Sequence, residues 1–121
     1  MYKNKKTEYI ILFILIIFLF IHHFCGFGGH FGWDDMEYAN LAHQWSNGTF
    51  HLSDNHFSFR IPVILFTGLV YKIFGVSDFS SALPALLLSI FILLLVLKLL
   101  YHRDSRIVIT ALVITTFVPS F

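Results

Sequence analysis

The sequence predicts an all-α membrane protein, in which transmembrane helices are joined by an outer loop that carries amphipathic juxtamembrane helices. Three observations predict this fold class. Of the 121 residues, 57% are hydrophobic and only 12% are charged, and the mean hydropathy is +0.77. Long uncharged apolar runs flank one polar segment at residues 26–60. A water-soluble domain of this composition would expose large apolar patches, so we expect lipid around it.

Residues 9–25 form the first predicted span. Three lysines precede the run, and no small-x-small cleavage site follows it, which indicates an uncleaved signal anchor. At about 1.5 Å per residue the run is just long enough to cross the hydrocarbon core. The lysines place the N-terminus in the cytoplasm and residues 26–60 outside. Cys25 cannot form an internal disulfide, and we expect it to be a small apolar residue at the end of this span.

A short helix is predicted from Asp34. Asp34 is a good N-cap, Glu37 stands three residues later as a capping-box partner, and Gly48 ends the pattern. Apolar side chains at helical spacing give this helix one apolar face, made of Tyr38, Leu41, Ala42 and Trp45. We expect that face to lie on the membrane surface.

Residues 61–74 are apolar but short for a span, and they follow an irregular stretch at 49–59. If they crossed inward, the next span at residues 82–101 would carry three cations to the outside, namely Lys98, Arg103 and Arg106. That arrangement opposes the positive-inside bias. We therefore place them in an outer loop over residues 26–81, which ends in a turn at 75–81.

The remaining residues continue the membrane pattern. Residues 102–106 are the expected cytoplasmic turn, and residues 107–121 begin a third span that covers about 22 Å. No polar flank follows that run. We therefore expect the chain to be the N-terminal part of a larger polytopic protein.

Asp34 and Asp35 are the candidate catalytic carboxylates, because they lie outside at the membrane boundary. One of them could act as a general base that deprotonates an acceptor hydroxyl or amine. Alternatively, Asp34 only caps the helix, and Asp35 and Glu37 favour the helix dipole. Arg60 has two readings as well: it binds a lipid-linked phosphate, or it anchors the loop to headgroups.

Six of the seven histidines lie at or beyond the outer end of the first span: His22, His23, His30, His43, His51 and His56. They could ligate zinc or manganese, but no H-x-x-x-H pattern or tight ligand spacing is present. We predict no metal site, and a divalent cation stays open as a cofactor. The net charge of +1, without basic runs interleaved with aromatic residues, argues against a nucleic-acid partner.

The order of these features resembles the N-terminal part of C-type (GT-C) membrane glycosyltransferases, especially the bacterial relatives of dolichyl-phosphate-mannose protein mannosyltransferases and lipid A aminoarabinose transferases. The resemblance rests on Trp33-Asp34-Asp35-x-x-Tyr38-Ala39, Phe59-Arg60-Ile61-Pro62, Tyr71-Lys72-Ile73-Phe74-Gly75-Val76 and Leu83-Pro84. It covers residues 9–121, about the first quarter of a family member. Two positions depart from the family: it often has lysine and two prolines where this chain has Arg60-Ile61-Pro62, and an arginine where Ala82 stands.

The resemblance implies a hexosyl or pentosyl transferase that moves a sugar from a polyprenyl-phosphate donor to a lipid, glycan or protein acceptor at the outer face of a bacterial plasma membrane. It assigns Asp34 to the acceptor and Arg60 to the donor phosphate. We therefore predict Asp34 and Asp35 as catalytic residues, and Arg60, Tyr38 and Glu37 as substrate-binding residues. By itself this first quarter of an enzyme is expected to be inactive.

Two other classes remain. One is a small non-catalytic accessory membrane protein, in which the acids only cap a helix and the histidines are interfacial. The other is a piece of a transporter or channel, which would place ionisable residues within its spans. Apart from Lys98 at a helix end, the long runs contain no charged residue, so this class ranks last.

Overall fold

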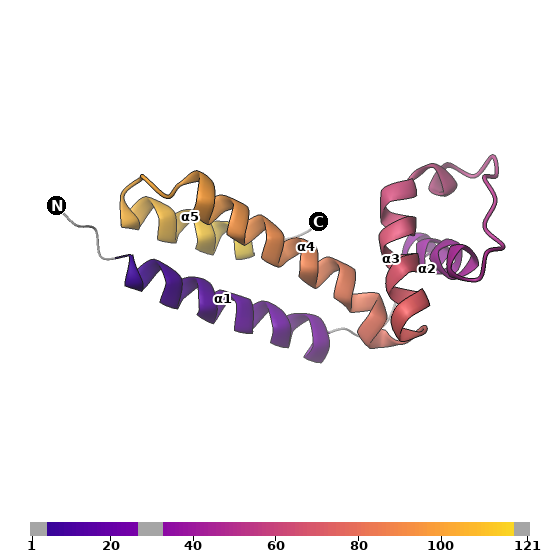
Figure 1. The fold of residues 1–121 in the computed structure, drawn as a ribbon, viewed down its shortest axis with the longest axis horizontal. Helices are drawn as coiled ribbons and strands as arrows, with labels where there is room; N and C mark the ends of the chain where they lie inside the picture. The colour runs from indigo at the N-terminus through magenta and orange to yellow at the C-terminus, as the bar shows by residue number, and fades with distance from the viewer. Residues whose placement is uncertain (1–4, 27–32, 118–121) are drawn as a thin grey trace. The chain divides into compact units, whose positions relative to one another are not determined.

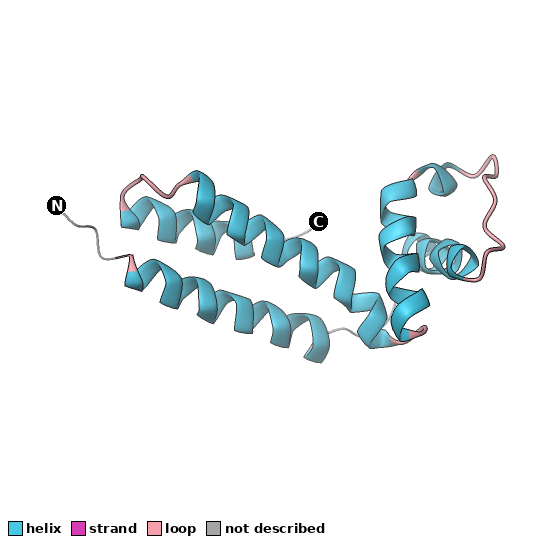
Figure 2. Ribbon diagram, in the orientation of Figure 1, coloured by secondary structure: helices cyan, strands magenta, loops and turns pink. Residues whose placement is uncertain are grey.

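The computed structural model describes residues 5–26 and 33–117. All secondary-structure elements of these residues are helices, which confirms the all-α prediction (Figures 1 and 2). In chain order they are α1 (Lys6–Cys25), α2 (Trp33–Ser46), the 3₁₀ helix η1 (His56–Phe59), α3 (Ile61–Phe74), α4 (Asp78–Leu99) and α5 (Ser105–Phe117). The chain divides into two compact units: unit 1 is Met1–His23 with Ala85–Phe121, and unit 2 is Phe24–Pro84, so the first turns of α4 belong to unit 2 and the rest to unit 1.

Two helices, α1 and α4, are long and apolar enough to cross a membrane. They contain 20 and 22 residues, and only 22% of the residues in the most apolar 18-residue stretch of each helix are buried. Large side chains therefore point outward, among them Phe13 at 63% and Phe91 at 61% exposure. The core helix of a soluble protein would bury such side chains, so this exposure favours a lipid environment. The helices α3 and α5 are apolar as well but shorter.

The helices of unit 1 each bury one narrow stripe of side chains. On α1 the stripe recurs at alternating spacings of four and three residues, as expected for a helix that packs along one side: Glu8, Leu12, Leu15 and Leu19. The stripes on the other two helices are Leu86, Leu93 and Leu97 of α4, and Val108 and Leu112 of α5. The rings of Phe18 and Phe117, with centroids 5.0 Å apart, join α1 to the end of α5.

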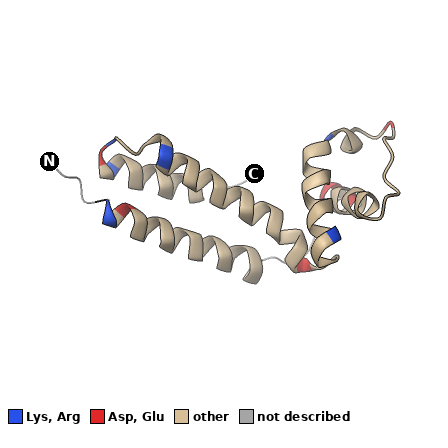
Figure 3. Cartoon of the chain, viewed as in Figure 1, with Lys and Arg blue, Asp and Glu red and all other residues tan. Residues whose placement is uncertain are grey.

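All Lys, Arg, Asp and Glu side chains among the described residues of unit 1 gather at one end of its helices (Figure 3). They are Lys5, Lys6, Glu8, Lys98, Arg103, Asp104 and Arg106. The helix bodies at residues 9–23, 85–97 and 107–117 carry none. Unit 1 therefore separates its charge from its apolar surface along the direction of its helices.

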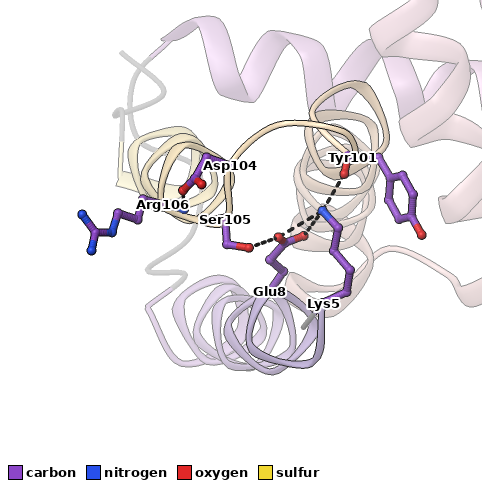
Figure 4. A network of polar contacts seen from close by, with 6 residues as sticks. All are labelled: Lys5, Glu8, Tyr101, Asp104, Ser105 and Arg106. Atoms are coloured by element: carbon purple, nitrogen blue, oxygen red, sulfur yellow. Dashed lines mark hydrogen bonds and ion pairs between the residues drawn. The ribbon is translucent and has the colours of Figure 1, made fainter. Parts of the chain in front are cut away.

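A polar network lies at this charged end (Figure 4). Glu8 is only 1% exposed, and Lys5 Nζ donates to both of its carboxylate oxygens at 3.1 Å. Ser105 Oγ donates to Glu8 Oε1 at 2.6 Å, and Lys5 Nζ also donates to the backbone oxygen of Tyr101. A buried carboxylate needs such partners, because its desolvation is otherwise costly. The network therefore joins the start of α1 to the loop between α4 and α5.

The predicted turn at residues 75–81 is wrong in its second half, because α4 begins at Asp78 rather than at Ala82. Ser77 Oγ accepts a hydrogen bond from the backbone N–H of Ser80 at 3.2 Å, which satisfies one of the unpaired N–H groups at the helix start. Ser80 itself is fully buried. The helix ends at Leu99 rather than at residue 101, and α5 begins at Ser105. Residues 118–121 of the predicted third span lie outside the described residues.

Unit 2 is built on the packing of α2 against α3. Its core cluster is Leu41 of α2, Phe57 of η1 and Ile64 of α3, each no more than 6% exposed. Three partly buried side chains pack against this cluster: Tyr38, Trp45 and Phe50. At the far end of α3, the hydroxyl groups of Tyr71 and Ser81 share a hydrogen bond of 2.9 Å, which ties α3 to the start of α4.

Two expectations for α2 need correction. Asp34 does not cap the helix, because α2 begins at Trp33 and Asp34 lies inside its first turn. The predicted apolar face is correct in its members, but α3 and η1 cover it instead of a membrane surface. Residues 49–59 are not wholly irregular either, since they include η1. The apolar face of α2 is thus used to position α3 and the residues that precede it.

Candidate functional site

The position of the candidate site depends on the close packing of α3 against α2 at Gly68. A Cβ atom at Gly68 would lie 2.7 Å from Cε3 of Trp45 and 2.9 Å from the backbone oxygen of Ala42. Because the second atom belongs to the backbone, α2 would have to shift to admit any side chain at this position. Glycine therefore lets the two helices meet, and it fixes where the start of α3 lies relative to α2.

Arg60 lies at the start of α3, and its backbone is held on both sides. Its N–H donates to the oxygen of Phe57 at 3.1 Å, and its own carbonyl oxygen accepts from the N–H of Val63 at 3.1 Å. Its guanidinium carbon lies 5.3 Å from the ring centroid of Tyr38, which is cation–π geometry. The side chain is exposed. The packing of α3 on α2 thus brings two of the five predicted site residues into direct contact.

Tyr38 provides the aromatic ring that the guanidinium group of Arg60 contacts. Its ring meets the ring of Phe57 edge-on, with centroids 5.2 Å apart and an interplanar angle of 78°. Its hydroxyl oxygen is buried and has no hydrogen-bond partner among the described residues. A buried hydroxyl without a partner costs about 1–3 kcal/mol. The aromatic contacts therefore hold Tyr38 in place against this cost.

Glu37 is tied to the loop on the other side of the core cluster. Its Oε1 accepts a hydrogen bond from Asn55 Nδ2 at 3.0 Å. Asn55 Oδ1 in turn accepts from the backbone N–H of Phe57 at 3.1 Å and so caps η1. The predicted role of Glu37 as a capping-box partner of Asp34 is therefore wrong, since its carboxylate orients Asn55 and, through it, the residue that supports Tyr38.

Asn55 is a residue that the sequence analysis missed. The signal was present, because asparagine is a favoured N-cap residue and two aromatic residues follow it closely. Ser58 in the same segment is fully buried, and its Oγ donates to the backbone oxygens of Ser53 at 2.9 Å and Asn55 at 2.7 Å. These bonds fix the loop that leads to Arg60.

Asp34 and Asp35 lie in the first turn of α2, and both are exposed. Asp34 stands four residues before Tyr38 and therefore on the same face of the helix, with about 5–6 Å between Cβ atoms. Asp35 lies to one side of that line. No ion pair joins Arg60 to a carboxylate within residues 5–26 and 33–117. Tyr38 thus contacts Arg60 and stands one helical turn after Asp34, and among the described residues no ion pair joins this exposed cation to an exposed carboxylate.

The histidines do not gather into a metal site within the part of the chain that the structure describes. No group of three or more His, Cys, Asp or Glu side chains there could hold a metal ion. The rings of His56 and Phe57 are tilted by 37° with centroids 3.9 Å apart, and His23 Nδ1 lies 2.9 Å from the backbone oxygen of Leu19. His30 lies outside the described residues. The described contacts of His56 and His23 are thus with residues close in the sequence.

Comparison with known proteins gives no family. The sequence matches no protein-family model, and neither curated proteins nor solved structures give a significant match.

Proposed function

We propose that this chain is the N-terminal part of a C-type membrane glycosyltransferase that transfers a sugar from a polyprenyl-phosphate donor to an acceptor at the outer face of a bacterial plasma membrane. One observation carries the proposal. The packing of α3 on α2 holds the guanidinium carbon of Arg60 5.3 Å from the ring centroid of Tyr38, and Asp34 stands one helical turn before Tyr38 on α2. This arrangement supports a site with a cation for the phosphate and a carboxylate for the acceptor.

Arg60 suits the donor phosphate. Its guanidinium group stays charged and can bind two phosphate oxygens with two parallel hydrogen bonds. The Tyr38 ring and the backbone bonds to Phe57 and Val63 fix the arginine before a ligand arrives. A cation held in advance where charge develops stabilises a departing phosphate without further reorganisation.

Asp34 suits the role of general base. Its exposed carboxylate takes the proton from the acceptor hydroxyl or amine while the acceptor atom attacks the anomeric carbon. The bond from that carbon to the lipid phosphate breaks, and the polyprenyl phosphate leaves with the electron pair. Attack from the face opposite the leaving group inverts the anomeric centre. Asp35 lies next to Asp34 and assists in binding the acceptor.

The membrane arrangement follows from unit 1. Its lysines and arginines lie at one end, and the positive-inside bias places that end in the cytoplasm. With a cytoplasmic N-terminus, α1 then crosses outward, and α4 crosses back. Residues 26–60, which include α2 and Arg60, lie outside. This is the side on which a lipid-linked donor would meet its acceptor.

The first test asks whether the coding sequence continues. Sequencing of the gene and its transcript beyond the codon for Phe121 should reveal further apolar spans in the same reading frame, because the proposal assigns this chain only the first part of an enzyme. A genuine stop codon there would contradict the proposal. It would favour the accessory protein, in which the hydrogen bond between Glu37 and Asn55 serves only to hold the loop of unit 2.

The second test measures transfer by the complete protein. Asp34→Asn should lower the rate of transfer from polyprenyl-phosphate sugars by about 10²–10⁴-fold, the range expected for loss of a general base. Asp54→Asn, which changes another exposed carboxylate of the same loop, is the matched control and should retain the full rate. Full activity of both Asp34→Asn and Asp35→Asn would contradict the proposed role of the pair.

A further inference from the structure

The charged end of unit 1 is not used by the proposed transfer reaction. Five cations lie there among the described residues, together with only two acids: Lys5, Lys6, Lys98, Arg103 and Arg106, with Glu8 and Asp104. No acid or further cation lies within the helix bodies that lead away from this end. The surplus of positive charge is therefore concentrated in one place, next to long apolar surfaces.

The two acids both accept hydrogen bonds within the protein. Glu8 is 1% exposed, and its oxygens accept hydrogen bonds from Lys5 and Ser105. Asp104 is exposed, but its Oδ1 accepts from the backbone N–H of Arg106 at 3.0 Å and so caps the start of α5. Glu8 thus joins the start of α1 to the start of α5, and Asp104 caps the start of α5.

Two of the cations, Lys98 and Arg106, have exposed side chains. The side chain of Arg106 extends away from the network, as Figure 4 shows. Lys98 is exposed in the last turn of α4. Each is followed in the sequence by an exposed apolar residue, with Leu99 at 72% and Ile107 at 54% exposure. A cation at the border of an apolar helix surface has the position of a lipid headgroup contact, since its aliphatic stem lies in hydrocarbon and its charge in water.

We propose that this end of unit 1 binds the headgroups of anionic phospholipids, with Lys98 and Arg106 as the principal contacts. The proposal rests on the membrane-spanning arrangement proposed above but not on glycosyl transfer. Anionic phospholipid fits better than an acidic protein, because the cations adjoin exposed leucine and isoleucine side chains that a water-soluble partner would leave in water. Attraction to an anionic leaflet strengthens binding about fivefold for each such cation.

The test uses the full chain in lipid. The chain is reconstituted into nanodiscs with equal amounts of phosphatidylcholine and phosphatidylglycerol, and native mass spectrometry counts the lipids of each kind that it retains. Wild type should retain phosphatidylglycerol preferentially, and high salt should reduce the preference. The double variant Lys98→Gln, Arg106→Gln should lose most of it, by an order of magnitude or more. Lys98→Arg, which keeps the charge, should retain it.

The control variant is Lys72→Gln, which removes an exposed cation of α3 in unit 2. It should leave the preference unchanged. Equal retention of the two lipids by wild type, or an equal loss in the control, would overturn the proposal. Helix content measured by circular dichroism separates unfolding of the double variant from loss of the site. If the chain fails to enter phosphatidylcholine bilayers at all, the membrane arrangement itself is wrong, whatever its lipid preference.

Discussion

Units 1 and 2 arrange their polar and apolar residues in different directions. In unit 1 the charges lie at one end of the helices, and the apolar surface runs along their length. In unit 2 the division runs across the helix pair. The exposed face of α2 carries polar residues such as Asp35 and His43, and the exposed face of α3 carries apolar ones such as Val63 and Ile73. The first pattern suits helices that cross a bilayer, and the second suits a pair that lies along its boundary.

The two units are also held together differently. Unit 1 combines narrow leucine stripes with a buried carboxylate network at one end. Unit 2 depends on the close contact at Gly68 and a small aromatic core. Both tryptophans, Trp33 and Trp45, belong to unit 2, so tryptophan emission reports on that unit alone. Amide hydrogen exchange, resolved by helix, reports on each unit separately.

The largest effect is expected from Glu8→Ala. The substitution leaves Lys5 and Ser105 without their buried partner, and loss of one member of a buried pair costs about 3 kcal/mol. Hydrogen exchange should accelerate in α1 and α5 and stay unchanged in α2 and α3. Glu8→Gln, which can still accept the hydrogen bond from Ser105, should show a smaller acceleration. Equal acceleration in both units would show that units 1 and 2 unfold together and not independently.

A somewhat smaller effect, confined to unit 2, is expected from Gly68→Ala. The added methyl group would overlap the backbone oxygen of Ala42, and such overpacking costs about 2 kcal/mol. The emission of Trp45 should shift to the red, and exchange in α2 should accelerate. Leu69→Ala is the matched control on the exposed side of α3, where no core contact is lost. An effect of the control as large as that of Gly68→Ala would contradict the proposed close packing.

The smallest effect, and the only stabilising one, is expected from Tyr38→Phe. It removes the buried hydroxyl without a described partner while keeping the ring under Arg60, so unit 2 should gain about 1 kcal/mol in its free energy of unfolding. Slower hydrogen exchange in α2 would reveal the gain. A destabilised Tyr38→Phe variant would mean that the hydroxyl has a partner in the folded protein, in which case its role in the site has to be revised.

The spacing of apolar residues along the sequence was enough to predict α3 and the buried face of α2. The structure gives α3 the bounds that the apolar run at residues 61–74 indicates, and α2 buries Leu41 and Ala42 as its spacing indicates. The partner of that face was not predictable, because nothing in the sequence of α2 distinguishes a lipid surface from a neighbouring helix.

Contacts between distant residues were also missed, because the sequence of one segment does not show which other segment packs against it. The sequence analysis did not single out Glu8, which accepts a hydrogen bond from Ser105, 97 residues away in the sequence. The contact of Arg60 with Tyr38 depends on Gly68, whose importance appears only once α2 and α3 are packed. Sequence reasoning therefore named the residues of the candidate site without the geometry that joins them.

The most direct test of this site measures binding of polyprenyl phosphate to the full chain in phosphatidylcholine nanodiscs, with tryptophan emission as the signal. Loss of a charge-assisted hydrogen-bonding group should make Arg60→Ala bind about 10–100-fold more weakly. Arg60→Lys, which keeps the charge but not the paired geometry, should lie between Arg60→Ala and wild type. Lys72→Ala should bind as wild type does. Unchanged binding in Arg60→Ala, or an equal loss in Lys72→Ala, would contradict the assignment of Arg60 to the lipid-linked phosphate.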